Sequence, residues 1–173
     1  LVAMTEDAPE AIIAAARRLR CSPLRYVNVG LAVARPLNGA HWLYLPEPQY
    51  PFYRVGSASN AVPSLAPMGR SSLYVELAND QSVPDGDVVE ALAAFLLEIG
   101  TIDDARQLLF AAFRTHPWGY VIFDEHCETA RRTILDFYHA HGVHSIGRYG
   151  EWTYNSMEDA ILAGIQTAKA IND

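Results

Sequence analysis

The irregular order of strand-like and helix-like segments constrains the fold of this chain more than any other feature. Four apolar or aromatic runs indicate strands at 24–34, 41–44, 52–57 and 71–77. Helical patterns interrupt these runs without the regular alternation that a parallel doubly wound sheet requires. We therefore predict an α+β fold with a mostly antiparallel β-sheet and packed helices.

Helices are expected at 7–20, 87–99, 102–114 and 125–140, and from Ser156 to the end. Capping boxes at Asp7–Glu10 and Ser156–Asp159 would open the first and last of them. Two further short strands are expected at 117–123 and 143–146, a loop at 58–70 and a polar turn at 80–85. We expect residues 1–145 to form one α+β region of the substrate-binding type, followed by a C-terminal turn and helix at 146–173.

Composition and charge exclude several classes of function. The 173 residues are about one domain, and half of them are hydrophobic, as in a globular protein. A net charge of −7 argues against nucleic acid or an anionic membrane as the main partner, since both need a basic face. Two cysteines, no targeting segment and no apolar run of spanning length favour a reduced, cytoplasmic protein.

The start of the chain indicates a piece of a longer polypeptide. It opens on Leu1-Val2-Ala3 in the middle of an apolar run, without a methionine at position 1. We expect the remainder to lie upstream.

The most informative local pattern is Gly147-Arg148-Tyr149-Gly150, which precedes the capped helix at Ser156. Glycines let backbone N–H groups approach a ligand, and the positive end of a helix dipole favours negative charge there. Arg148 adds a fixed positive charge with several donors. The segment therefore suggests a site for an anionic or electron-rich ligand, with a plain structural turn as the alternative.

The stretch from Gly147 to Gly164 resembles the C-terminal FAD motif of the flavoproteins related to amine oxidases, protoporphyrinogen oxidase, phytoene desaturase and UDP-galactopyranose mutase. The resemblance implies that the turn residues Gly147, Arg148, Tyr149 and Gly150 lie beside the flavin. It also implies that Ser156, Met157 and Glu158 offer it backbone N–H groups.

A second block, from His41 to Glu76, is similar to the substrate-domain strands of the same flavoproteins. The resemblance implies that Arg54 and Tyr154 lie on the substrate side of the flavin. From the aromatic set Trp42, Tyr44, Tyr53, Trp152 and Tyr154, we expect some members to line a cavity and the others to pack in the core. The candidate substrate residues are Tyr53, Arg54, Trp152 and Tyr154.

The sequence departs from the pattern of these flavoproteins in two respects. The mutases usually carry an acidic residue where this chain has Ser156. No G-x-G-x-x-G fingerprint occurs, so most of the ADP half of FAD has no predicted binding site on this chain. We therefore expect the N-terminal dinucleotide-binding domain to be absent, and this fragment to be without FAD and inactive alone.

Other chemistries fit the residues less well. His139, His141 and His144 flank a helix end that Gly142 breaks, so no metal site is predicted. His126 and Cys127 are neighbours on a helix and would point apart, which disfavours a nucleophile pair. Ser57, Ser71 and Ser72 lack the G-x-S-x-G turn of a hydrolase.

We therefore interpret the chain as the C-terminal part of an FAD-dependent oxidoreductase that acts on a small-molecule substrate, with no catalytic side chain assigned. Two alternatives stay open. One is a flavin-dependent isomerase similar to UDP-galactopyranose mutase, and the other is a scaffold or interaction domain without activity. The face left by the missing FAD domain would then drive self-association.

Overall fold

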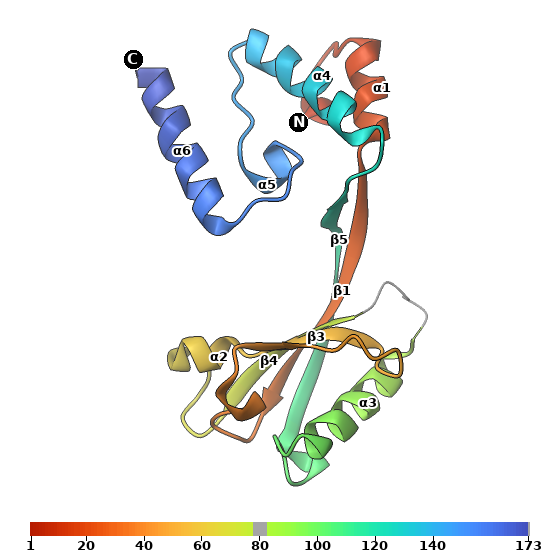
Figure 1. Cartoon of the computed structure of the whole chain (residues 1–173), viewed down its shortest axis with the longest axis vertical. Helices are drawn as coiled ribbons and strands as arrows, with labels where there is room; N and C mark the ends of the chain where they lie inside the picture. Colours follow the sequence, from red (N-terminus) through yellow and green to blue (C-terminus); the bar gives the residue numbers. More distant parts are fainter. Residues whose placement is uncertain (78–82, 173) are drawn as a thin grey trace. The chain divides into compact units, whose positions relative to one another are not determined.

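A computed structural model describes residues 1–77 and 83–172 of the chain. The helices are α1 (Glu10–Arg18), α2 (Ala58–Ala61), α3 (Asp85–Glu98), α4 (Cys127–Ala140), α5 (Gly147–Gly150) and α6 (Met157–Asn172). The strands are β1 (Arg20–Leu31), β2 (Trp42–Tyr44), β3 (Phe52–Gly56), β4 (Ser71–Leu77) and β5 (Leu108–Ile122) (Figure 1). Antiparallel pairing of these strands confirms the predicted α+β class.

The chain divides into two compact units. Unit 1 contains residues 1–22 and 118–173, and unit 2 contains residues 23–117. The long strands β1 and β5 run through both, so each unit holds part of both strands.

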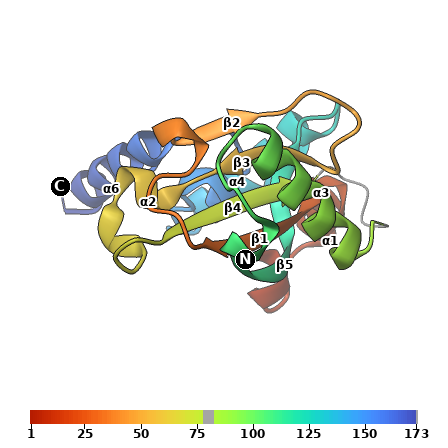
Figure 2. The same ribbon diagram turned by 90° about the horizontal axis from the view of Figure 1, so that it is seen from below.

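Unit 2 is built on the sheet, whose strand order is β2-β3-β4-β1-β5 (Figure 2). Alternate residues of β1 and β4, such as Val27 opposite Val75 and Val29 opposite Leu73, point to one face. Helix α3 covers that face, because Val88, Leu92, Phe95 and Leu96 belong to the same buried cluster as the strand residues. This apolar layer is the core of unit 2.

The opposite face of the sheet carries aromatic rings laid over glycines. A Cβ placed on Gly56 would lie 2.2 Å from Cζ of Tyr74, its cross-strand neighbour. A Cβ on Gly30 would lie 2.2 Å from Cε1 of Phe110. Both glycines are therefore required for the rings to lie flat on the strands.

Unit 1 has a smaller core, formed where α1 packs against α4. Ile12 and Ala15 of α1 contact Ala130, Ile134 and Tyr138 of α4 in one buried cluster. Helix α6 contributes no buried residue. No helix in the described ranges 1–77 and 83–172 is long and apolar enough to cross a membrane.

Most predicted helices and strands lie where we expected them, but two are wrong, and the loop expected at 58–70 contains helix α2 and a 3-10 turn. The helix expected at 102–114 is instead a short 3-10 turn (Ala105–Gln107) that leads into β5, where pairing in the sheet overrides the helix-forming Ala, Leu and Arg residues. The strand expected at 143–146 is an irregular connection. Residues 80–82 of the polar turn expected at 80–85 lie outside the described residues, and Asp85 begins α3.

The capping box expected at Asp7–Glu10 is also wrong. Helix α1 begins after Pro9, which has no side chain that can cap the helix. Asp7 instead adopts a left-handed conformation with a φ of 54°.

Candidate functional site

The segment from Gly147 to Asn155 is folded by contacts of its own. Gly147 has a φ of +82°, which favours glycine, and the following residues form the single turn α5. The hydroxyl of Ser145 donates to the carbonyl of Gly150 at 2.8 Å, and the hydroxyl of Tyr149 donates to the carbonyl of Gly119 in β5 at 2.9 Å. The Tyr149 hydroxyl therefore ties α5 to β5.

The guanidinium of Arg148 holds the end of this segment. Its Nε and Nη2 donate to the carbonyl oxygen of Asn155 at 3.2 and 3.0 Å. The same guanidinium lies 5.0 Å from the ring centroid of Tyr154, a cation–π contact. Arg148 is thus fixed by a forked hydrogen bond and an aromatic ring, in a geometry that lysine cannot reproduce.

Helix α6 begins with the predicted capping box. The N–H and hydroxyl of Ser156 donate to the Asp159 carboxylate at 2.7 and 2.8 Å, and the Asp159 N–H donates to the Ser156 hydroxyl at 3.2 Å. These hydrogen bonds from the backbone and hydroxyl of Ser156 lower the pKa of Asp159.

The capping box changes which N–H groups are available. The role of Ser156 as a donor to a ligand stays a prediction, and in this structure its N–H donates to Asp159. The N–H groups of Met157 and Glu158 have no acceptor among the described residues, as expected for the first turn of a helix. These two N–H groups and the guanidinium of Arg148, which the Asn155 carbonyl holds, form a patch of hydrogen-bond donors at the start of α6, where Asp159 already accepts from Ser156.

A small cavity of about 30 Å³ borders this patch. It is lined by Tyr120, Val121, Phe123, Arg148, Thr153 and Tyr154. Tyr120 and Phe123, at the end of β5 and just beyond it, were not among the predicted site residues. The only signal for them was an aromatic pair at the end of a predicted strand, which core packing explains equally well.

Two polar atoms next to the cavity residues are buried without a partner within the described parts of the chain. They are the indole Nε1 of Trp152 and the side-chain oxygen of Asn155. Trp152 also has a φ of 52°, a strained conformation for a bulky residue, at a cost of about 1–3 kcal/mol. Unsatisfied polar groups and backbone strain cost stability, and both occur more often at functional sites.

The residues of this segment fit one edge of a flavin. A flavin edge presents carbonyl and ring-nitrogen acceptors, and the segment offers N–H donors at Met157 and Glu158. The space next to Gly147 is open, with no heavy atom within 4 Å of an added Cβ.

The other two predicted substrate residues, Tyr53 and Arg54, lie in unit 2 and meet at Glu76. A β-bulge between Phe52 and Arg54 turns the strand, so that both side chains reach the same carboxylate. The Tyr53 hydroxyl donates to Oε2 of Glu76, and Arg54 Nη2 forms an ion pair with Oε1. Glu76 is only 6% exposed, so this is a largely desolvated charge pair that must stay paired.

Arg54 lies between two tyrosine rings on the open face of the sheet. Its guanidinium carbon is 5.8 Å from the ring centroid of Tyr44 and 5.9 Å from that of Tyr74. Nη1 donates to the Tyr44 hydroxyl at 3.4 Å. Glu76, Tyr44 and Tyr74 were not predicted as site residues, although a carboxylate between Val75 and Leu77 in a strand is a recognisable signal.

The cysteines and histidines show no reactive arrangement. Burial raises the pKa of the Cys127 thiol, and the Asp124 carboxylate raises it further. The ring of His141 hydrogen-bonds to the carbonyl of Phe137 at 2.7 Å. Within residues 1–77 and 83–172, no group of three or more His, Cys, Asp or Glu side chains could hold a metal ion.

Comparison with known proteins gives matches only among solved structures. No protein-family model and no curated protein matches this chain. The crystal structure of reduced UDP-galactopyranose mutase matches 82% of the chain with a TM-score of 0.67 and 24% sequence identity. The chain therefore shares its fold with part of that protein.

Two further matches have low scores. A protein from Pyrococcus furiosus matches with a TM-score of 0.44 and 15% identity over 83% of the chain. An oxidoreductase from Methanosarcina mazei matches with a TM-score of 0.37 and 19% identity over 67% of the chain. The chain spans 31%, 38% and 27% of the mutase, the Pyrococcus protein and the oxidoreductase, respectively.

Proposed function

We propose that this chain supplies the flavin-closing segment and the substrate-facing sheet of an FAD-dependent oxidoreductase of the amine oxidase or protoporphyrinogen oxidase type. The observation that carries the proposal is the patch made by Arg148 and the open N–H groups of Met157 and Glu158. The fold shared with the mutase supports it, since that protein was crystallised in a reduced state.

The chemistry divides between cofactor and protein. Bound FAD supplies hydride or electron transfer, and the protein supplies binding, orientation and electrostatics. Arg148 and the two N–H groups would stabilise negative charge at the flavin edge, because preorganised donors need no rearrangement when charge develops. Arg54, held by Glu76 and two tyrosine rings, would bind an electron-rich group of the substrate.

A flavin-dependent mutase is the second candidate, and the match to UDP-galactopyranose mutase favours it. Ser156 argues against it, since the mutases usually carry an acidic residue there. Turnover separates the two: a mutase interconverts UDP-sugars under reducing conditions with no net redox change. An oxidase reduces oxygen or a dye in the presence of amines, porphyrinogens or polyenes.

FAD retention tests the flavin assignment in the complete polypeptide that contains this chain. Arg148→Ala should weaken FAD binding by about tenfold or more, since it removes a charge-bearing donor from the patch. Arg132→Ala, an exposed change on α4 in the same unit, is the matched control and should leave binding unchanged. A protein that never binds FAD, or that tolerates Arg148→Ala as well as Arg132→Ala, would contradict the assignment.

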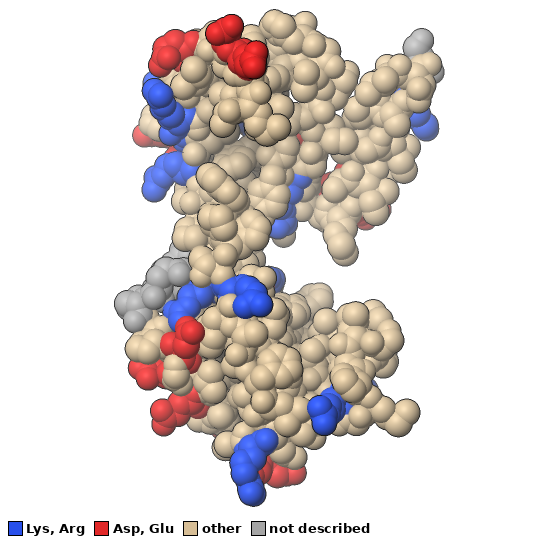
Figure 3. All heavy atoms as spheres, turned by 180° about the vertical axis from the view of Figure 1, so that it is seen from behind, with Lys and Arg blue, Asp and Glu red and all other residues tan. Residues whose placement is uncertain are grey.

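We further propose that the flavin-binding part covers the exposed face of α6. Met157, Ile161, Leu162, Ile165 and Ile171 are large apolar side chains between 46% and 86% exposed. Much of the α6 surface in Figure 3 is uncharged. Without its cover such a face should self-associate. Light scattering should then show this chain becoming monomeric when Ile161 and Ile165 are both changed to Glu, and an unchanged mass would contradict this proposal.

A further inference from the structure

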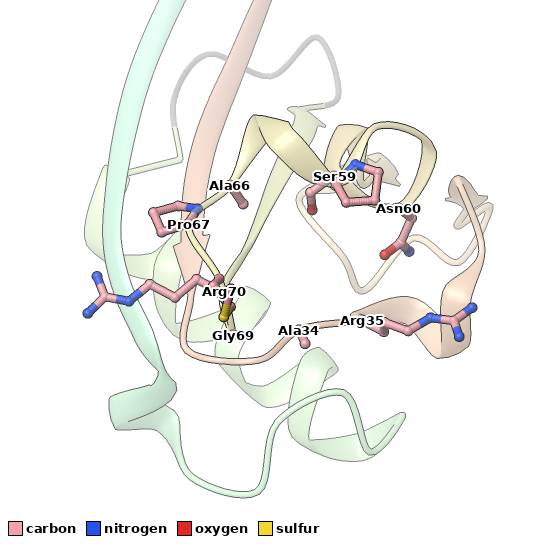
Figure 4. A pocket seen from close by; sticks show the side chains of 10 residues that line it. Ala34, Arg35, Ser59, Asn60, Ala66, Pro67, Gly69 and Arg70 are labelled. Atoms are coloured by element: carbon pink, nitrogen blue, oxygen red, sulfur yellow. The ribbon is translucent and has the colours of Figure 1, made fainter.

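Unit 2 contains a cavity that neither the flavin segment nor the Arg54 cluster uses. Its volume is about 500 Å³ (Figure 4). One wall is Ala34 and Arg35, which follow β1, and the other is formed by residues between Ser59 and Arg70. A cavity of this size is in the range of small-molecule sites.

All the charge on the lining is positive. Arg35 and Arg70 are its only charged residues, and neither has an acidic partner in the described part of the chain. The walls lie within two stretches of sequence, 11–46 and 48–75, that contain no Asp or Glu, although the whole chain carries a net charge of −7. The cavity is therefore a local basic site on an acidic protein.

The two arginines are placed apart. Figure 4 shows their guanidinium groups at opposite ends of the cavity, each directed outward. A ligand that used both would need acidic groups at its two ends. Between them lie apolar surfaces of Ala34, Pro63, Ala66 and Pro67, which suit a carbon skeleton.

The turn that follows Arg35 in the chain has an unusual backbone conformation. Leu37, Asn38 and Gly39 all have left-handed φ values, of 57°, 52° and 83°. The side-chain amide of Asn60 spans this turn, because Nδ2 donates to the carbonyls of Pro36 at 2.8 Å and Ala40 at 2.7 Å. Asn60, which lines the cavity, thus fixes the backbone that follows Arg35.

We propose that this cavity binds a small organic anion with two separated acidic groups, either carboxylates or phosphates. Both arginine side chains are exposed, and they would turn inward from the positions in Figure 4 so that each binds one group in the forked geometry that guanidinium and oxyanions share. The site lies wholly within unit 2 and shares no residue with the flavin patch. It is therefore testable in this chain without a flavin.

Methionine amides report on the binding directly. The chain has three methionines, so selective ¹⁵N-methionine labelling gives three NMR signals. Met68 lines the cavity and is fully exposed, whereas Met4 lies in a short 3-10 helix in unit 1. Titration with citrate or with fructose 1,6-bisphosphate, whose two phosphates lie at opposite ends, should shift the Met68 signal to saturation with a Kd of about 1 mM or tighter, and leave Met4 in place.

Three variants decide between a built site and general attraction of anions. Arg35→Gln and Arg70→Gln should each weaken binding by about tenfold. Arg114→Gln makes the same change of charge on an arginine outside the cavity lining and should alter the Kd by no more than about twofold. Arg70 is exposed in a loop, so its variant should keep the fold even if Arg35→Gln does not.

Saturation by citrate alone would assign carboxylates, and saturation by fructose 1,6-bisphosphate alone would assign phosphates. Either result supports the site. Absence of a saturable Met68 shift with both ligands would overturn the proposal, as would equal weakening by Arg114→Gln.

Discussion

Replacing Gly56 by alanine tests how the sheet presents Arg54. The added Cβ would lie 2.2 Å from Cζ and 2.4 Å from the hydroxyl oxygen of Tyr74, far inside van der Waals contact. The ring must therefore swing away, and its contact with the Arg54 guanidinium at 5.9 Å is lost.

The expected magnitude follows from two opposing effects. Overpacking of this kind costs about 1–3 kcal/mol. Alanine also restricts the unfolded chain more than glycine does, and this raises the free energy of unfolding by about 0.4–1 kcal/mol. The difference is about 0–2.6 kcal/mol, and the midpoints of the two ranges predict that Gly56→Ala lowers the free energy of unfolding by about 1.3 kcal/mol.

Urea denaturation of four variants checks this account. Gly86→Ala, in the first turn of α3, is the matched control, since nothing lies within 4 Å of its Cβ; it should be neutral or slightly stabilising. In a Tyr74→Ala background, Gly56→Ala should cost nothing, because the ring it displaces is gone. A Gly56→Ala protein as stable as the Gly86→Ala control, or additive effects in the double variant, would refute the reasoning.

Three further predictions concern unit 1. Arg148→Lys should speed hydrogen exchange of the Asn155 region, because lysine cannot make the forked bond; unchanged exchange would count against the role of Arg148. Asp159 should titrate below its ordinary value of about 3.9 in an NMR titration, and Ser156→Ala should raise its pKa. Because the folded-state pKa is lowered, this cap stabilises α6 above the unfolded pKa, and that stability is lost as pH falls through the folded value. Cys127, whose thiol pKa burial raises, should react with a thiol reagent far more slowly in the folded than in the unfolded protein, and equal rates would contradict its burial.

Local sequence signals were sufficient where the chain makes its own contacts. The box at Ser156–Asp159 is complete within four residues, so the start of α6 could be read directly. The strand at 71–77 alternates because one of its faces is buried.

Local sequence patterns failed to predict the structure where it depends on contacts between residues far apart in the sequence. Residues 108–114 favour a helix by composition, but they form β5 by pairing beside β1, about 80 residues earlier in the chain. Likewise, Glu76 meets Tyr53 and Arg54 only through the register of β3 and β4. Tyr120 lines the small cavity only because the loop that carries Thr153 and Tyr154 packs beside it. No local pattern encodes either contact.

The same methionine labels give the most direct test of the flavin patch. In the complete polypeptide, FAD should produce a large shift of the Met157 amide, whose N–H is open at the start of α6, while Met4 stays in place. If FAD binds tightly and the Met157 amide does not move, the flavin does not meet this helix, and the central proposal is wrong.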